Sequence, residues 1–232
     1  MSLISCNGIS KIYKMGEVEI KALKNISLEI HKSQFVSFIG PSGSGKTTIL
    51  NLFGVLDKPT LGSVKVNGTD ISKLNYVERA KFRGENLGFI FQNFNLIPVL
   101  TVFENVEYPL VMVKSLPKEE RKKKVLSLLD EVGMLDQKDK MINQISGGQK
   151  QRAAIARALT TDPKIVFADE PTANLDHESA FKVMHLMKKL SREIGTTFIF
   201  STHDPKIVKE VDIIYTLEDG ALVNRQERGK DE

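Results

Sequence analysis

The order of apolar and polar positions along the chain predicts strands that alternate with helices. Residues 4–10 and 22–30 alternate between apolar and polar side chains, as half-buried strands do, and a short polar connection at residues 11–17 separates them. Residues 35–39 and 165–170 are continuous apolar runs, the second ending in two carboxylates, and such runs are typical of buried parallel strands. Further strands are expected at residues 63–66, 88–91, 197–202, 213–217 and 221–223.

Helical patterns lie between these strands. They are expected at residues 46–53, 118–132, 150–159 and 178–194. Residues 93–134 mix apolar positions with prolines and charged residues, and we interpret them as a mostly helical insertion. Strands that alternate with helices in this way predict an α/β fold around a parallel sheet.

The first candidate site is the sequence GPSGSGKT, which joins the strand at residues 35–39 to the following helix. Glycines without a Cβ let successive backbone N–H groups turn inward around an anionic phosphate, and the helix start adds its positive end. Lys46 would reach the β- and γ-phosphates, and the Thr47 hydroxyl would hold Mg²⁺. The candidate phosphate-binding residues are Gly40, Pro41, Ser42, Gly43, Ser44, Gly45, Lys46, Thr47 and Thr48.

Polar side chains follow three of the expected core strands. Asp169 and Glu170 end one strand, where Asp169 would hold Mg²⁺ and Glu170 would activate the attacking water. His203 follows another strand and could donate to a γ-phosphate oxygen. Gln92 follows the strand at residues 88–91, where its amide could reach a metal or water, although a polar residue that simply leaves the strand is the better explanation of this position by itself.

A second anion-binding helix start lies far along the chain. Ser146, Gly147, Gly148 and Gln149 precede a helical pattern rich in alanine. One phosphate loop and two anion-binding ends suggest a composite site, which the two-fold symmetry of a homodimer would complete.

Composition and charge narrow the class of protein. The chain has 232 residues, of which 41% are hydrophobic and 27% charged, as in an ordinary globular protein. A net charge of +4 is mild, and the basic run at residues 118–124 carries two glutamates in its first turn, so we expect no nucleic-acid partner. No apolar stretch approaches the roughly 20 residues of a membrane span, and the N-terminal residues lack a signal-peptide pattern. The single cysteine, Cys6, is expected in the core.

Taken in order, these motifs resemble those of the ATP-binding-cassette (ABC) ATPases over nearly the whole chain. The resemblance implies a P-loop NTPase of the ABC type, with a mixed parallel core sheet, an antiparallel β subdomain and a helical signature subdomain. Residues 1–232 would form one ABC ATPase domain. Residues 1–92 and 160–232 would supply the RecA-like core and β subdomain, and residues 93–159 the helical signature subdomain.

The resemblance also implies roles for individual residues. Tyr13 would stack on the adenine of ATP, although a lone tyrosine is more often simply packed on the surface. Ser146 to Gln149 resemble the family signature, which touches ATP on the partner subunit, and Asp176 resembles the D-loop aspartate. Gln92 resembles the Q-loop residue that helps to hold the metal, and His203 the switch histidine. Lys46, Gln92, Glu170 and His203 would be catalytic, and Thr47, Gln92 and Asp169 would hold Mg²⁺.

Three positions depart from the resembled pattern. Ile145 replaces the usual leucine of the signature, which is a volume-conserving change. Ser33 stands where a glycine is usual, so its backbone must avoid positive φ or accept some strain. Asn174 stands where many cassettes have a small residue, although the Asn-Leu-Asp form also occurs among them.

Within the family, the stretches at residues 16–19, 52–62 and 95–106 resemble the lipoprotein-release, macrolide- and peptide-export and cell-division ATPases, the LolD, MacB and FtsE types. The resemblance implies a peripheral subunit on the cytoplasmic side of the inner membrane. It would use ATP to close a homodimer and drive a separate permease with a large extracytoplasmic domain. Two alternatives stay open at this point: control of cell-wall enzymes without transport, and a soluble ABC ATPase that acts on nucleic acid.

Overall fold

The structure is a computed structural model that describes residues 2–204 and 207–228. The strands are β1 (Ser2–Met15), β2 (Val18–His31), β3 (Phe35–Ile39), β4 (Leu61–Val66), β5 (Thr69–Asp70), β6 (Leu87–Ile90), β7 (Ile165–Asp169), β8 (Thr197–Ser201), β9 (Ile213–Glu218) and β10 (Ala221–Glu227). The α-helices are α1 (Lys46–Phe53), α2 (Tyr76–Asn86), α3 (Val102–Val113), α4 (Lys118–Glu131), α5 (Gly147–Leu159) and α6 (His177–Ile194). Short 3₁₀ turns are η1 (Ile71–Lys73), η2 (Leu135–Gln137), η3 (Ile142–Gln144) and η4 (Ile207–Glu210).

The strands form two sheets. The six-stranded sheet has the order β10-β9-β3-β8-β7-β6, and all neighbouring pairs are parallel except the antiparallel edge pair β9 and β10. The four-stranded sheet has the order β2-β1-β4-β5 and is antiparallel throughout. The predicted combination of a mixed parallel core sheet and an antiparallel sheet is therefore confirmed.

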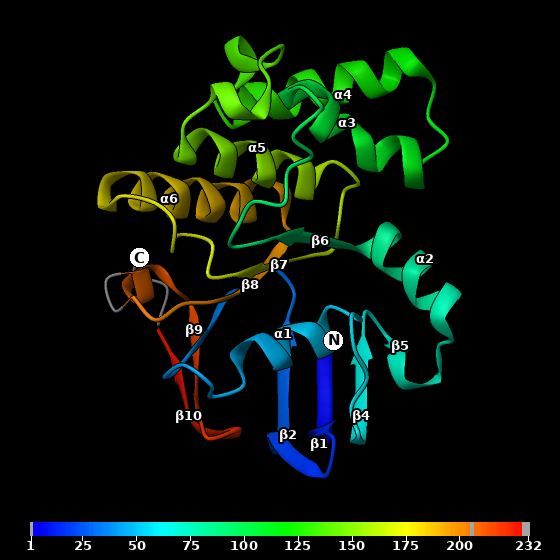
Figure 1. The fold of residues 1–232 in the computed structure, drawn as a ribbon, viewed down its shortest axis with the longest axis vertical. Coiled ribbons are helices and arrows are strands. Elements are labelled where there is room, and N and C mark those ends of the chain that lie inside the picture. Colours follow the sequence, from blue (N-terminus) through cyan, green and yellow to red (C-terminus); the bar gives the residue numbers. More distant parts are fainter. Residues whose placement is uncertain (1, 205–206, 229–232) are drawn as a thin grey trace.

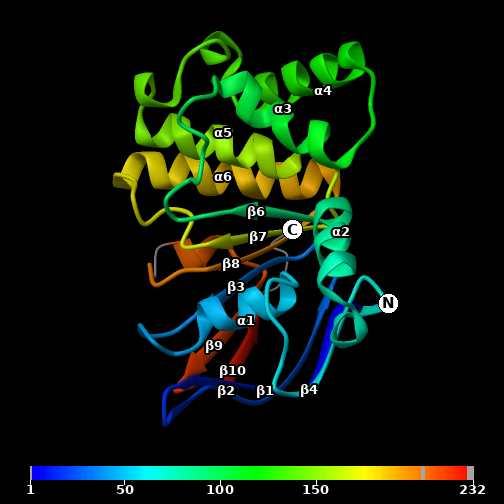
Figure 2. The ribbon, with the colours of Figure 1, turned by 45° about the vertical axis from the view of Figure 1, so that its right-hand side comes forward.

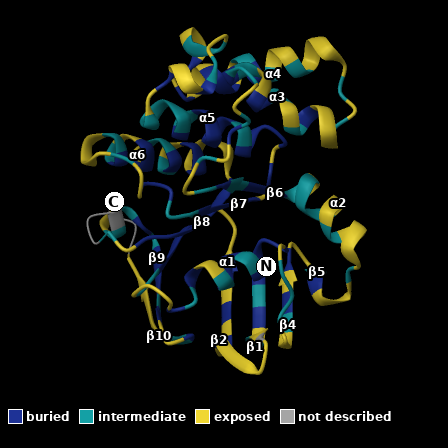
Figure 3. Cartoon of the chain, viewed as in Figure 1, coloured by how far each residue is buried: buried dark blue, intermediate teal, exposed yellow. Residues whose placement is uncertain are grey.

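The elements stack in layers, which Figures 1 and 2 show from two sides. Helix α1 lies between the two sheets, α5 and α6 cover the opposite face of the six-stranded sheet, and α3 and α4 lie outermost. Strand β8 shows why both faces are apolar: Phe198 and Phe200 join the core beneath the helices, whereas Ile199 joins the core around α1. In Figure 3 the central strands β3, β7 and β8 are mostly dark blue, whereas α2, α4, β10 and the β1–β2 hairpin carry many exposed residues.

The structure corrects two sequence expectations. Residues 11–15 belong to β1, and a two-residue turn at Gly16 and Glu17 leads directly into β2, so residues 11–17 are not a polar loop. Helix α2 was not expected, because most of its residues are polar. In the structure none of its residues is buried. Its start was nevertheless visible in the sequence, since Asn75 and Glu78 form a capping box.

Ser33 adopts a backbone φ of 58°, so it takes the left-handed conformation that a glycine would favour. Its N–H donates to the Thr197 hydroxyl at 2.9 Å, and this bond holds the turn against the start of β8.

Cys6 is buried, and burial raises the pKa of its thiol to about 11, which agrees with the expected place in the core. Of the helices within residues 2–204 and 207–228, none is long and apolar enough to span a bilayer.

Candidate functional site

The carboxyl ends of β3, β6, β7 and β8 meet at one edge of the six-stranded sheet. Ile39, the last residue of β3, pairs with Thr216, and Asp169, the last residue of β7, pairs with Ser201 at the end of β8. The phosphate loop, Gln92, Glu170 and the segment with His203 all follow these ends in the sequence. Such an edge is where open α/β sheets bind their ligands, and the structure therefore gathers most of the predicted site residues there.

The phosphate loop wraps around a lysine. The Lys46 ammonium donates to the carbonyl oxygens of Gly40 at 2.9 Å and Pro41 at 2.8 Å, and the residue is only 7% exposed. The Ser44 hydroxyl is buried and has no hydrogen-bond partner among the described residues. An anion held by this loop would give the Ser44 hydroxyl a partner and would accept from the third N–H of the Lys46 ammonium, because both groups donate to phosphate oxygens.

Helix α1 presents its positive end to the same loop. Gly45 precedes the helix with φ at 101°, no side chain caps the free N–H groups, and no acidic residue occupies the first turn. Free N–H groups at a helix start attract anions. The loop thus fits a phosphate in charge and in hydrogen-bonding capacity.

Thr47 and Asp169 connect the phosphate loop to β7. The Thr47 hydroxyl donates to Asp169 Oδ2 at 2.9 Å, and the Ser201 hydroxyl donates to Asp169 Oδ1 at 2.6 Å. A hydroxyl and a carboxylate are hard oxygen ligands of the kind that Mg²⁺ prefers. The donor set therefore fits the predicted magnesium site.

Glu170 and His203 lie beside this pair. Glu170 Oε1 is 3.2 Å from His203 Nδ1, and the Glu170 N–H donates to the Ser201 hydroxyl at 2.9 Å. The Glu170 backbone has a φ of 46°, an uncommon value for a residue with a side chain. Ser201 therefore holds the Asp169 carboxylate through its proton and the Glu170 backbone N–H through its oxygen.

Gln92 follows β6 and is tied to the segment after Glu170. The Asn174 amide donates to the Gln92 carbonyl oxygen at 3.0 Å and to Asn93 Oδ1 at 3.1 Å. The Gln92 side chain is exposed, and among the described residues it makes no hydrogen bond of its own. Asn174, one of the unusual positions in the sequence, thus bridges two loops of the site.

The second anion-binding helix start lies elsewhere. Ser146 caps α5, where its hydroxyl accepts from the Gln149 N–H at 3.3 Å and its own N–H donates to Gln149 Oε1 at 2.9 Å. Asp176 caps α6 by accepting from the Ser179 N–H at 3.0 Å, and hydrogen bonds from Ser179 hold its pKa below the usual range. Among the described residues, no hydrogen bond or ion pair joins residues 146–149 or Asp176 to the phosphate loop.

Gly147 and Gly148 lie against residues 174–179. A Cβ on Gly147 would lie 3.6 Å from Leu175 Cδ2, and one on Gly148 would lie 3.3 Å from the Ser179 hydroxyl. Gly147 and Gly148 thus pack beside residues 174–179 of the same chain.

Tyr13 is 36% exposed and lies on β1. Its hydroxyl donates to Asp57 Oδ2 at 3.0 Å, and burial together with this bond raises the pKa of the phenol, although the nearby Thr48 hydroxyl opposes the rise. The contact with Thr48, in the first turn of α1, places Tyr13 close to the phosphate loop.

Comparison with known proteins agrees with this geometry. The family described as ABC transporter matches residues 23–173. The chain is 42% identical to the lipoprotein-releasing system ATP-binding protein LolD of Francisella tularensis, over 95% of both chains. It is 40% identical to the macrolide export ATP-binding/permease protein MacB of Syntrophobacter fumaroxidans, over 96% of this chain and 31% of that protein.

The chain belongs to the ABC transporter family.

Its fold is similar to a solved dimeric structure of the ATP-binding cassette MJ0796 of Methanocaldococcus jannaschii in a post-hydrolysis state with ADP and Pi. The TM-score is 0.89 at 44% identity, over 98% of this chain and 100% of that one. The P-loop NTPase fold of the ABC type is therefore confirmed, and the chain is an ABC-type ATPase.

Sequence reasoning missed two residues that organise this site. Ser201 forms hydrogen bonds with both Asp169 and Glu170. It could have been predicted as a site residue, because it is a polar residue at the end of a core strand. Gln151 of α5 is fully buried and donates to the Pro171 carbonyl oxygen at 2.6 Å, next to Glu170. No signal in the sequence distinguished Gln151 from any other polar residue of a helix.

Proposed function

We propose that the chain is the ATP-hydrolysing subunit of an export- or release-type ABC transporter and drives a separate permease with a large extracytoplasmic domain. The observation that carries the enzymatic part is the hydrogen bond from Thr47 to Asp169, which brings the phosphate loop and the strand-end carboxylates into one site. The similarity to LolD and MacB supports the transporter class. The proposed place is the cytoplasmic side of the inner membrane, as a peripheral subunit.

The described residues suggest which of them bind ATP, which hold Mg²⁺ and which act on the attacking water. Lys46, Ser44 and the free N–H groups of α1 would bind the phosphates of ATP, and Thr47, Asp169 and Gln92 would hold Mg²⁺. Bound Mg²⁺ would neutralise charge on the phosphates. Glu170 would accept the proton of the attacking water, and His203, 3.2 Å away, would orient Glu170 and stabilise charge at the γ-phosphate.

The dimer is the second part of the proposal. Residues 146–149 bind no phosphate loop within their own subunit, yet α5 begins there with two glycines and no acidic residue in its first turn. Two copies related by a two-fold axis would place each helix start at the phosphates held by the other copy. ATP bound between them would favour the closed dimer by linkage.

We also propose that residues 93–159 act as the helical signature subdomain on a core formed by the rest of the chain.

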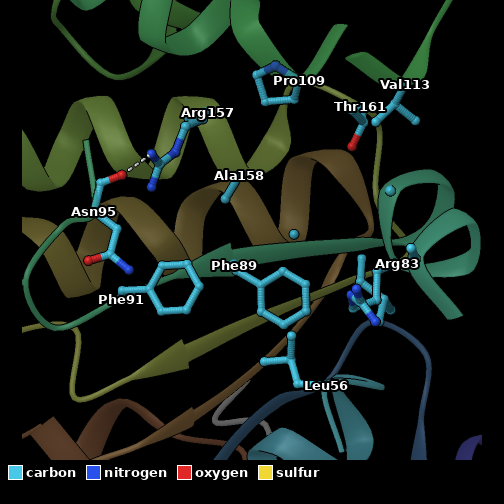
Figure 4. Close-up of a pocket in the computed structure, with 14 residues that line it drawn as sticks. Leu56, Arg83, Phe89, Phe91, Asn95, Pro109, Val113, Arg157, Ala158 and Thr161 are labelled. Atoms are coloured by element: carbon cyan, nitrogen blue, oxygen red, sulfur yellow. Dashed lines mark hydrogen bonds between the residues drawn. The ribbon is translucent and has the colours of Figure 1, made fainter. Parts of the chain in front are cut away.

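The permease needs a docking surface, and a groove between α2, α3, α5 and β6 is suited to it. Figure 4 shows this groove, which has a volume of about 360 Å³. Leu56, Phe89 and Phe91 provide its apolar surface, and Arg83 and Arg157 supply two cations without a carboxylate in the lining. Because Phe91 directly precedes Gln92, a segment bound here would act next to the catalytic site.

The apolar character continues outside the groove. Tyr76 and Val77 of α2 are 75% and 72% exposed, and Met112 of α3 is 65% exposed. Exposed apolar patches of this kind mark surfaces that bind proteins or membranes. The proposed occupant is therefore a cytoplasmic segment of the permease with an apolar face and at least one carboxylate.

Purification of tagged Glu170→Gln protein from detergent-solubilised native membranes, with ATP and Mg²⁺ present, tests this function. We expect mass spectrometry to find a stoichiometric membrane protein with a large extracytoplasmic domain. Ala80→Trp, in the exposed groove wall on α2, should abolish this recovery without lowering the ATPase activity of the isolated protein, whereas Lys122→Trp on α4 should not. Recovery of nucleic acid or ribosomes without a membrane protein would refute the transporter.

A further inference from the structure

Three side chains form a tight cluster beside the phosphate loop. Lys11 and Tyr13 come from β1, and Asp57 from the loop after α1. Asp57 Oδ1 accepts from Lys11 Nζ at 2.7 Å, and Asp57 Oδ2 accepts from the Tyr13 hydroxyl at 3.0 Å. Lys11 Nζ also lies 4.9 Å from the centre of the Tyr13 ring and donates to the Lys58 carbonyl oxygen at 2.9 Å. The Asp57 carboxylate thus holds the Tyr13 hydroxyl, and the Lys11 ammonium covers one face of the ring.

The cluster is anchored to the helix of the phosphate loop. The Asp57 N–H donates to the Asn51 carbonyl oxygen of α1 at 3.2 Å, and the Lys58 N–H donates to Asp57 Oδ1 at 2.7 Å. The Lys11 side chain is only 12% exposed, so the ion pair with Asp57 is largely screened from water. The position of the Tyr13 ring is therefore defined relative to α1, whose N-terminal end faces the phosphate site.

The charges in the cluster agree with its hydrogen bonds. Burial alone would raise the pKa of the Asp57 carboxyl, but hydrogen bonds from Lys11, Lys58 and Tyr13 lower it below its usual value. Asp57 is therefore ionised at neutral pH. A cation over one face of an aromatic ring is attracted by the electrons of the ring, so Lys11 favours the arrangement in which that face is covered.

We propose that Lys11 and Asp57 are positioning residues for Tyr13, and that they hold its ring with one face covered and the other presented to the purine base of ATP. The inference rests on the proposed role of Tyr13 in stacking on that base. Its physical basis is preorganisation: a ring that is already ordered loses little conformational freedom when the base binds. The anchor to Asn51 sets the spacing between the base and the phosphates.

Steady-state ATPase kinetics of the full chain test the proposal through Lys11→Met, Asp57→Asn and Tyr13→Phe. Each variant keeps the aromatic ring but removes one of its restraints. We expect the KM for ATP to rise about three- to tenfold, because a cation over the ring contributes about that much and the variants keep the ring, so that only part of the larger stacking contribution is lost. The kcat should stay within about twofold, since no group that touches the reacting atoms changes. Lys11→Arg, which keeps the cation, should restore most of the affinity.

Inorganic tripolyphosphate serves as a probe of the phosphate site, because it has no base. Its inhibition constant against ATP should be the same in the wild type and in Lys11→Met. If that constant rises in parallel with the KM for ATP, the substitution has disturbed the phosphate loop and the proposal is wrong. Arg121→Met is the matched control: it removes an ion pair to Glu107 of similar burial, 2.9 Å long, between α3 and α4, and should leave both constants unchanged.

Tyr13→Ala separates this inference from the function on which it rests. An unchanged KM in Tyr13→Ala would show that the tyrosine does not bind the base, and both the stacking assignment and the inference would fall. A raised KM in Tyr13→Ala together with wild-type values in Lys11→Met and Asp57→Asn would keep the stacking role and overturn the inference alone.

Discussion

Gly40 and Gly43 lie three residues apart in the phosphate loop and should respond very differently to the same substitution. Both have backbone angles that side chains rarely adopt, with φ at 146° and 79°. A Cβ on Gly40 would lie 2.1 Å from the Leu217 carbonyl oxygen of β9 and 2.8 Å from the Ser44 hydroxyl, whereas a Cβ on Gly43 would meet nothing within 4 Å. Gly40→Ala therefore forces β3 away from β9, and Gly43→Ala adds only conformational strain.

The expected losses of stability differ because Gly43→Ala adds strain alone, whereas Gly40→Ala adds both strain and a steric clash. Gly43→Ala should cost about 1–2 kcal/mol, the penalty of a left-handed conformation for a residue with a Cβ. Gly40→Ala adds the cost of overpacking against backbone, about 1–3 kcal/mol, to a backbone strain of about 1–3 kcal/mol. For a domain of this size, each kcal/mol lowers Tm by about 2–4 °C, so we expect losses of about 2–8 °C for Gly43→Ala and about 4–24 °C for Gly40→Ala.

Differential scanning calorimetry of both variants without nucleotide makes the comparison. The absence of nucleotide is essential, because the loop binds the ligand and ligand binding shifts Tm by itself. Equal Tm losses in the two variants would refute the argument from the distance to Leu217. A Gly40→Ala variant that melts like the wild type would show in addition that β9 does not lie where the structure places it.

Three further predictions concern the catalytic edge and the cluster beside it. Glu170→Gln should fold normally but lose about 10²–10⁴-fold in kcat, the usual contribution of a general base, and rapid multiple-turnover hydrolysis in that variant would remove Glu170 from this role. Asn174→Ala should lower kcat more than it raises KM, because it releases the segment after Glu170 from Gln92; equal changes in the two constants would contradict this. The lowered pKa of Asp57 stabilises the fold above the usual Asp pKa of about 3.9, and this contribution disappears as pH falls through the folded-state value. Urea unfolding at a series of acidic pH values should therefore show a flatter decline for Asp57→Asn than for the wild type.

Local signals were strong enough to locate the core elements from the sequence. Helix α1 begins at Lys46 and ends at Phe53 as predicted, because glycines stop the helical pattern at both ends. Strands β3 and β7 were found because buried parallel strands are continuously apolar. Helix α2 was missed for the opposite reason, since its composition is mostly polar and it buries no residue.

The gathering of polar residues at one edge of the sheet could also be predicted, since the ends of parallel strands converge and polar residues placed there must lie close together. Asp169, Glu170 and His203 were all placed at this edge in this way. The partners within the edge could not be predicted: Ser201 lies on β8, whereas the Asp169 carboxylate and the Glu170 N–H that it contacts lie at the end of β7. Only the register of β7 against β8 brings them together.

The sequence by itself determined the α/β fold, the phosphate loop and the chemical types of the site residues, because each depends on residues that are neighbours in the chain. Only the tertiary structure decided which of these residues meet. It joined Thr47 to Asp169, kept Ser146 away from the phosphate loop of its own subunit, and brought Asp57 to Tyr13 across 44 positions of the chain. The physical reason is that such contacts depend on how sheets and helices pack, and packing sums small contributions from residues far apart in the sequence.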